Sequence, residues 1–230
     1  MPLSNSAGDL RTSKKARSGP DLLLLLSLLS VILLSPVLDH GDLRRLILTG
    51  LTFVPVILAT VRLAQTRKFV LPSILLMSIT FVFGVIGIFA GNRLILSLKW
   101  GSLAAFFALT VIGLFSYLRE ARSVLQSHLY TAVSIYLLLG MLWFALYSVL
   151  DTASPGSFMH SNNLMADRHT ELLYFSLVTL STIGYGDVLP VSGEARMLAA
   201  LEGVTGVLYI AISVAILISA FKRTEPSGQD

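Results

Sequence analysis

Cysteine is missing from this 230-residue sequence, and charged residues are scarce. Without cysteine, the chain can have no disulfide framework, no thiolate metal site and no cysteine nucleophile. Charged residues make up 13% of the sequence and hydrophobic residues 54%, and the mean hydropathy is +0.78. A soluble domain of this length could not bury so much apolar surface, so the composition predicts that lipid surrounds much of the chain.

Residue clusters that would carry enzyme chemistry are also missing. The four histidines are scattered, and we find no metal-ligand cluster, nucleophile–base pair or phosphate-binding loop in the sequence. We therefore expect no enzyme and no cofactor. The net charge of +4 would suggest a nucleic-acid partner in a soluble protein. Here the basic residues lie between apolar segments, where they set membrane orientation, so we expect no nucleic-acid partner.

Long apolar segments are what the sequence does contain. A helix needs about 20 apolar residues to cross the bilayer core, and its backbone polar groups must be satisfied internally. Six segments fit this description: Leu22–Leu38, Leu46–Val61, Phe69–Ala90, Trp100–Leu118, Leu129–Leu150 and Met197–Phe221. A further apolar run, Leu172–Ile183, is too short to span. The predicted fold class is therefore an all-α membrane protein with six transmembrane helices and a re-entrant segment.

Lysine and arginine are unevenly distributed between the loops. Both tails, the loop between the second and third segments and the loop between the fourth and fifth carry most of them. The positive-inside rule then places both termini in the cytoplasm. An alternative interpretation of residues 1–38 is a cleaved signal peptide with a basic start and a Leu-rich core. The run of 17 uncharged residues is long for a signal peptide, and no clear cleavage site follows it.

The most specific motif follows the short apolar run. Residues 182–187 read TIGYGD. In this setting the sequence resembles the pore domain of the potassium channel family, whose selectivity filter is exemplified by TVGYG; Ile183 replaces the valine. The resemblance covers residues 129–221 and implies an outer helix, a short re-entrant helix, a filter and an inner helix. It implies a potassium-selective channel, with potassium ions and membrane lipids as its partners.

The resemblance also assigns roles within the filter. It implies potassium sites lined by the backbone carbonyl groups of Thr182, Ile183, Gly184 and Tyr185, with the Thr182 hydroxyl at the innermost site. Gly184 and Gly186 permit the positive φ angles that turn successive carbonyl groups toward one axis. Tyr185 is expected to point away from that axis. Because one chain supplies one quarter of a ring, the resemblance implies a closed homotetramer.

The helix expected at Thr170–Ser181 carries residues that would support the filter. Many family members have tryptophans at Tyr174 and Phe175, and Phe175 cannot donate a hydrogen bond. Bacterial two-helix relatives have a buried glutamate at Val178. Asp187 therefore either lacks the usual partner, which would weaken the filter, or receives a hydrogen bond from Tyr174 or a neighbouring subunit.

The last apolar segment contains two unusual positions. Gly206 matches the hinge glycine of the family, although a glycine there could equally permit close helix packing. Glu202 is an ionisable residue within a span, which is rare and often functional. It is expected either to hydrogen-bond the short helix or to influence filter gating. The resemblance places one face of this helix on the ion pathway: Val207, Ile210, Val214 and Ile218.

Several polar residues lie near the expected outer mouth. Glu171, Asp187 and Glu194 could concentrate cations there, whereas Asp151 and Asp167 are expected to be solvated loop charges. His160 and His169 are expected to be ordinary exposed loop histidines, with a pH sensor as the alternative.

The expected organisation has a four-helix membrane domain before the pore domain. Its boundaries are a tail at 1–21, the membrane domain at 22–122, the pore domain at 123–221 and a second tail at 222–230. The fourth segment has no regular repeat of basic residues, so we do not expect it to sense voltage. The expected location is a bacterial inner membrane. A non-conducting membrane subunit and a membrane enzyme are the competing interpretations, and the sequence leaves the gating stimulus open.

Overall fold

The structure is a computed structural model, and it describes residues 19–36, 53–62, 67–119, 126–160 and 168–222. Most of these residues are helical. The elements are α2 (Gly19–Leu34), a short helix at Phe53–Arg62, α4 (Arg67–Ala90), α5 (Arg93–Arg119), α6 (Gln126–Ala153), β1 (Phe158–His160), α7 (Arg168–Leu180), β2 (Val188–Pro190) and α8 (Gly193–Lys222).

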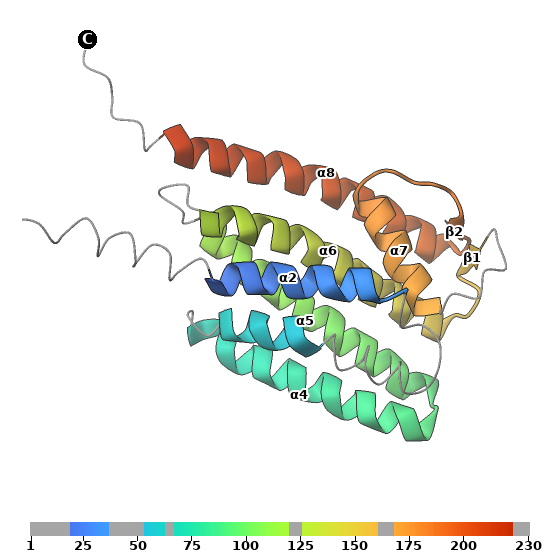
Figure 1. The fold of residues 1–230 in the computed structure, drawn as a ribbon. Coiled ribbons are helices and arrows are strands. Elements are labelled where there is room, and N and C mark those ends of the chain that lie inside the picture. The colour runs from blue at the N-terminus through green and yellow to red at the C-terminus, as the bar shows by residue number, and fades with distance from the viewer. Residues whose placement is uncertain (1–18, 37–52, 63–66, 120–125, 161–167, 223–230) are drawn as a thin grey trace, which may run out of the picture.

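The long helices run side by side, and the shorter α7 lies at one end of them (Figure 1). Helix α6 is central, because it packs against α2, α5, α7 and α8, whereas α4 packs on the far side of α5. The first residues of α2 and the last residues of α8 lie at the same end of the molecule, opposite α7 and the two strands (Figure 1). The first residue of α2 and the last residue of α8 therefore lie on the same side of the molecule (Figure 1).

Among the residues that the structure describes, four helices are long and apolar enough to cross a membrane: Phe69–Gly87 within α4, Arg93–Arg119, Gln126–Ala153 and Gly193–Ser219. The first predicted span corresponds to α2, which is apolar but only 16 residues long. The second corresponds in part to the short helix Phe53–Arg62, and its earlier half falls outside the described residues. The structure therefore supports four of the predicted six spans by length.

Helices α5 and α8 begin four or more residues before the predicted spans, where polar residues at their starts act as caps. Helix α5 begins at Arg93 rather than Trp100, and the side chain of Asn92 accepts a hydrogen bond from the backbone N–H of Leu94 at 2.9 Å. Helix α8 begins at Gly193 rather than Met197, and the hydroxyl of Ser192 accepts from the backbone N–H of Ala195 at 3.1 Å. Such caps satisfy N–H groups that have no partner inside the helix.

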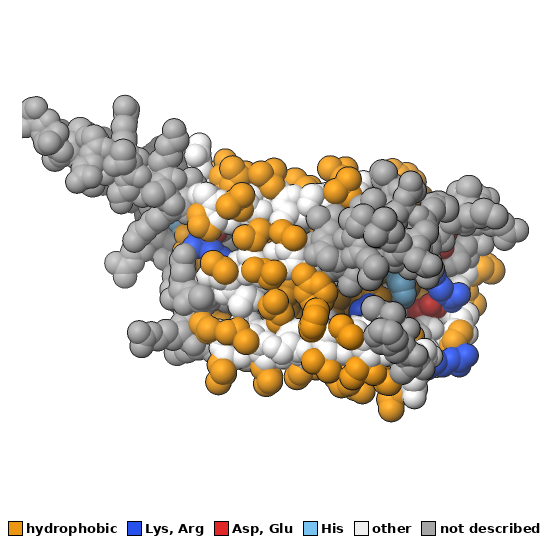
Figure 2. Space-filling model, turned by 60° about the horizontal axis from the view of Figure 1, so that its bottom comes forward, with side chains coloured by type: hydrophobic (Ala, Val, Ile, Leu, Met, Phe, Trp, Pro, Cys, Tyr) orange, Lys and Arg blue, Asp and Glu red, His pale blue; other side chains and the backbone are white. Residues whose placement is uncertain are grey.

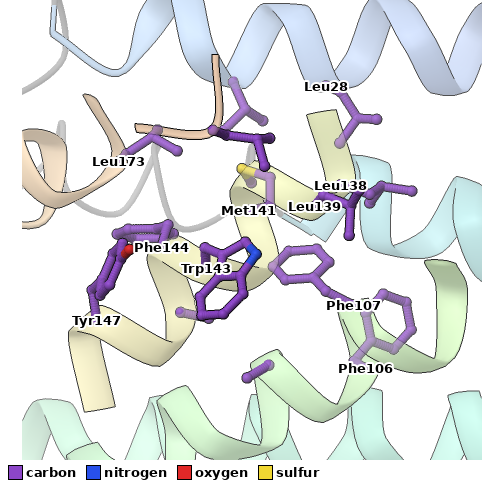
Figure 3. Close-up of a cluster of buried hydrophobic side chains, with 14 of the residues drawn as sticks. Leu28, Phe106, Phe107, Leu138, Leu139, Met141, Trp143, Phe144, Tyr147 and Leu173 are labelled. Carbon is purple, nitrogen blue, oxygen red and sulfur yellow. The ribbon is translucent and has the colours of Figure 1, made fainter. Parts of the chain in front are cut away.

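The core forms where α2, α5, α6 and α7 meet (Figure 3). Helix α6 supplies most of its side chains, and Trp100 of α5 contacts the edge of Phe144 at 5.3 Å between ring centroids. The buried core residues labelled in Figure 3 are Leu28, Phe106, Phe107, Leu138, Leu139, Met141, Trp143, Phe144, Tyr147 and Leu173. This packing connects α6 and α7 to the helices that precede them.

The outer faces of α4 and α8 remain strongly apolar. Leu71 and Leu75 on α4 are exposed, as are Leu208 and Ile212 on α8. On the face drawn in Figure 2, hydrophobic side chains cover the middle, and charged side chains and histidine lie toward the two ends. Apolar surface in a band between charged ends is what a chain surrounded by lipid presents.

A two-stranded antiparallel sheet, which the sequence did not predict, stands near α7. Phe158 pairs with Pro190, and His160 pairs with Val188. The backbone N–H of Val191 also donates to the carbonyl of Ser157 at 2.8 Å. The strands are too short for an alternating pattern to be recognised in the sequence. Their pairing ties the loop after α6 to the chain that follows the TIGYGD motif.

Candidate selectivity filter and its support

Helix α7 is fixed at its start by an ion pair with the end of α6. It begins at Arg168 rather than Thr170 and ends at Leu180 rather than Ser181. The Arg168 guanidinium makes a two-pronged contact with Asp151, in which Nε meets Oδ2 and Nη2 lies 2.5 Å from Oδ1. The expectation that Asp151 is a solvated loop charge is therefore wrong, because its side chain is buried in this pair. Asp167 lies outside the described residues.

The backbone after α7 alternates between ordinary and positive φ angles. The φ angles are 59° at Thr182, 58° at Gly184 and 78° at Gly186, while Ile183 and Tyr185 between them are not positive. The positive angles expected at Gly184 and Gly186 are confirmed. The positive angle at Thr182 was not expected, because a β-branched residue adopts this conformation only at a free-energy cost.

Backbone hydrogen bonds hold the start of this segment against the end of α7. The N–H of Ile183 donates to the carbonyl of Val178 at 3.0 Å, and the N–H of Thr182 donates to the carbonyl of Thr179 at 2.9 Å. Val178 thus supports the segment through its backbone, a role that its side-chain type does not reveal. The end of α7 also carries the negative end of the helix dipole, which favours a cation nearby.

Tyr174 is the partner of Asp187. Its hydroxyl donates to Oδ2 of Asp187 at 2.6 Å, and this hydrogen bond holds the pKa of the Asp187 carboxyl below its ordinary value. The ring of Tyr185 lies parallel to that of Tyr174, with centroids 6.4 Å apart and an angle of 2° between the planes. Of the two alternatives left open by the sequence, the structure shows the one in which Tyr174 supplies the bond.

Phe175 has an apolar role in the same helix. Its ring lies 5.2 Å from that of Tyr147 and 5.6 Å from that of Phe158. Phe175 therefore packs α7 against α6 and the first strand, and the hydrogen bond that it cannot make is supplied by its neighbour in the chain.

Glu202 on α8 is completely buried where α8 faces α6 and α7. Its carboxyl Oε1 lies 2.6 Å from the hydroxyl of Ser176 on α7, and its Oε2 accepts a hydrogen bond from the hydroxyl of Tyr147 on α6. The expected hydrogen bond to the short helix is confirmed. Tyr147 and Ser176 were missed, because only the three-dimensional packing brings these two residues to Glu202.

Two glycines allow the helices around α7 to approach closely. A Cβ atom at Gly206 of α8 would lie 2.0 Å from the carbonyl oxygen of Leu180, and one at Gly140 of α6 would lie 2.7 Å from Cδ2 of Leu177. Helix α8 is continuous through Gly206. The structure thus shows a close-packing role for Gly206, and its role as a hinge stays a prediction.

The remaining candidate residues are spread over the exposed side of α8 and the outer end of the molecule. Ile183 and Tyr185 are exposed in the single chain, and so are the four residues expected on the ion pathway, Val207, Ile210, Val214 and Ile218. Glu171 and Glu194 lie in the first turns of α7 and α8. His160 lies in β1.

His169 departs from the expectation of an ordinary exposed histidine. It lies in α7, and its ring contacts that of Trp100 with centroids 4.7 Å apart. The contact joins α7 to α5. Over the residues that the structure describes, no group of acidic and histidine side chains is arranged to hold a metal ion.

The comparison with known families agrees with this geometry. The ion channel family matches residues 104–223, which include α6, α7, the candidate filter segment at residues 182–186 and α8. The chain belongs to the ion channel family and is not an enzyme. With its apolar helices, it is an integral membrane protein.

Its relatives include several potassium channels. The chain is 31% identical to the inward rectifier potassium channel Kirbac3.1 of Paramagnetospirillum magnetotacticum over 37% of its own length and 25% of that protein. It is 28% identical to the potassium voltage-gated channel protein Shal of Drosophila melanogaster over 44% of its own length and 18% of that protein. The chain thus spans at most a quarter of the length of these relatives. No solved structure matches the chain closely enough to count as a relative.

Proposed function

We propose that this chain is a subunit of a potassium-selective channel that conducts potassium ions passively. The observation that carries the proposal is the alternation of positive φ angles at Thr182, Gly184 and Gly186, directly after α7. This alternation turns successive carbonyl groups toward a common side, where they can replace the water around a potassium ion. Relatives named as potassium channels support the same ion. No cofactor and no nucleic acid enters this function.

The proposed channel is a homotetramer with the filter on its axis. A single chain supplies one segment of a filter ring, and a cyclic arrangement closes that ring. The filter residues Ile183 and Tyr185 and the apolar residues Val214 and Ile218 of α8 are all exposed in the single chain. In the proposed tetramer, neighbouring copies and the ion pathway would cover these residues.

The proposed membrane arrangement has six spans. Helices α4, α5, α6 and α8 cross the bilayer, and the shorter α2 and Phe53–Arg62 are the described parts of the first two spans. Both tails lie in the cytoplasm, since the basic residues are concentrated there. The start of α2 and the end of α8 lie at the same end of the molecule, which fits this arrangement (Figure 1). A bacterial inner membrane is the proposed location.

Ion flux in liposomes tests the proposal. The purified protein is placed in potassium-loaded liposomes with valinomycin as the positive control. We expect a barium-sensitive flux that strongly favours potassium over sodium. Gly184→Ala should abolish this selectivity, because φ at Gly184 is +58°, where a Cβ atom is strained. Gly101→Ala is the matched control, since Gly101 lies in α5 with open space around its Cβ position.

Each failure has a distinct meaning. Flux without selectivity, unchanged by Gly184→Ala, would show that residues 182–186 are not a potassium filter. A folded oligomer that conducts no ion, with the valinomycin control working, would favour a non-conducting subunit.

A further inference from the structure

Among the described residues, the buried acid Glu202 has no cationic partner. It lies on α8 and contacts Tyr147 of α6 and Ser176 of α7. The titratable groups that interact with it are Tyr147 and Tyr136, both on α6, and α7 presents only the uncharged Ser176. In the described part of the chain, no lysine, arginine or histidine forms an ion pair with Glu202. A buried carboxylate without a cation is strongly disfavoured.

The number of hydrogen atoms around Glu202 indicates its protonation state. The Ser176 hydroxyl oxygen lies 2.8 Å from the carbonyl oxygen of Gly140 and 2.6 Å from Oε1 of Glu202. The Tyr147 hydroxyl contacts Oε2. These three contacts need three hydrogen atoms, but the two hydroxyl groups supply only two, because a carbonyl has none to donate. The third must come from Glu202 itself.

We propose that Glu202 is a neutral carboxylic acid and that its proton positions α7, the helix before the candidate filter. Tyr147 donates to Oε2 of Glu202, the protonated Oε1 donates to Ser176, and Ser176 donates to the carbonyl of Gly140. This hydrogen-bond chain joins α6, α7 and α8. Only its effect on ion flow rests on the proposed channel function.

These hydrogen bonds lie where α7 packs closely between α6 and α8. Leu177, next to Ser176, lies against Gly140 of α6, and the carbonyl of Leu180 lies against Gly206 of α8. The carbonyl of Val178, two residues after Ser176, accepts the hydrogen bond from Ile183 in the filter. A shift of Ser176 therefore moves the groups that hold the filter segment.

Loss of the proton would break this arrangement in a defined way. A carboxylate at Glu202 would need the single hydrogen of Ser176, so the Gly140 carbonyl would lose its Ser176 bond. The buried negative charge would also draw in water or force α7 outward. Glutamine avoids both effects, because its carbonyl accepts from Tyr147 and its amide group donates to Ser176. Alkaline pH should therefore reduce ion flow in the natural protein and not in Glu202→Gln.

Infrared spectroscopy of the protein in lipid tests the protonation state without requiring conduction. We expect a carbonyl band of a protonated carboxylic acid at neutral pH, which shifts in heavy water and disappears in Glu202→Gln. Glu194→Gln is the matched control, because Glu194 lies exposed in the first turn of the same helix. A spectrum with only carboxylate bands, unchanged in Glu202→Gln, would overturn the proposal.

Flux measurements test the positioning role. Glu202→Gln should keep the neutral-pH flux and remove its alkaline decline. Ser176→Ala should lower the flux by about tenfold, since it leaves a buried carbonyl and a buried acid without their partner. Thr205→Val is the control, because the Thr205 hydroxyl donates to the Leu201 carbonyl of its own helix at 2.7 Å. A Glu202→Gln protein that folds but loses flux at neutral pH would overturn the role of a neutral acid.

The two assays separate this inference from the proposed function. A protonated-acid band in a folded protein that conducts no potassium would reject the channel function and leave the protonation of Glu202 intact. Selective conduction without that band would do the reverse.

Discussion

At the scale of single residues, the partner of Asp187 depends on the direction of one side chain. The sequence showed that Phe175 cannot donate a hydrogen bond and that Tyr174 can, but it could not show where the Tyr174 hydroxyl lies. In the structure, this hydroxyl donates to Asp187 at 2.6 Å, and the ring lies parallel to that of Tyr185. One tyrosine therefore contacts both the filter segment and the acid that follows it.

Tyr174→Phe should weaken the filter, because it removes the hydroxyl and keeps the ring. A hydrogen bond to a partly exposed charged group contributes about 1 kcal/mol. We expect conduction to decline faster during sustained recording in planar bilayers, with weaker discrimination between potassium and sodium. Tyr209→Phe is the control, since the Tyr209 hydroxyl donates to the Ala132 carbonyl between α8 and α6. If both variants behave alike, the bond to Asp187 does not brace the filter.

At the scale of helices, the pattern of apolar residues predicted which helices exist better than it predicted where each helix begins. All four membrane-capable helices were predicted from their apolar residues, but α5 and α8 begin earlier, at caps formed by Asn92 and Ser192. The two strands and the partners of Glu202 were missed. Each of these depends on residues far apart in the chain, and a single sequence carries no signal for such pairs.

Two glycines of α8, one turn apart, allow the effect of close packing on stability to be distinguished from the effect of helix flexibility. Gly206→Ala places a Cβ atom against the Leu180 carbonyl and should destabilise the protein by about 1–3 kcal/mol. Gly203→Ala meets no atom of its own chain within 4 Å and should stabilise the helix by about 0.5–1 kcal/mol. Thermal unfolding in detergent compares the two. Equal destabilisation would show that subunit contacts, not Leu180, govern both positions.

An ion pair buried between the early helices gives a further prediction. Arg62 at the end of the short helix contacts Asp21 in the first turn of α2, with its Nη2 3.1 Å from Oδ2, and its guanidinium lies 4.6 Å from the ring centre of Tyr117. Asp21 was expected in a cytoplasmic tail, but it is buried in this pair. The pair joins α2 and the short helix to α5, so it belongs to the membrane domain.

Arg62→Met should destabilise the protein by about 3–5 kcal/mol, because it leaves Asp21 buried without a cation. The double variant Asp21→Asn with Arg62→Met should lose less, since no charge remains. Denaturant unfolding in detergent measures both. Arg93→Met, at the exposed start of α5, is expected to have little effect. A double variant less stable than Arg62→Met would contradict the explanation from an unpaired charge.

At the scale of the whole molecule, the apolar side of α8 is the main unexplained surface of the single chain. Val207, Ile210, Val214 and Ile218 were placed on the ion pathway by family resemblance, and all four are exposed. Their exposure agrees with the proposed tetramer, but a single chain cannot distinguish a water-filled cavity from a subunit contact. The sequence and the structure of one chain therefore predict less about how subunits assemble than about the helices within the chain.

The absence of cysteine makes this surface directly testable. Val214→Cys introduces the sole thiol of the protein. Charged thiol reagents added from the cytoplasmic side should block potassium flux if Val214 lines the ion pathway. Ile112→Cys, at an exposed position of α5, is the matched control and should remain conducting. If the reagent blocks neither variant, and mass spectrometry finds no reagent bound at position 214, Val214 lies away from the ion pathway.

Thr182 has a consequence for the stability of the assembled protein. Its φ of 59° lies where a β-branched residue costs about 1–3 kcal/mol, and every subunit of the proposed homotetramer would carry the same residue. Ions bound between the subunits would then be stabilising ligands, so the unfolding temperature should rise with potassium at constant ionic strength and not with sodium. No difference between the two cations would mean that the protein alone holds Thr182. If the difference is found, the ion that the protein transports is also the one that keeps it folded. The stability of the protein then depends on the potassium concentration of the cell.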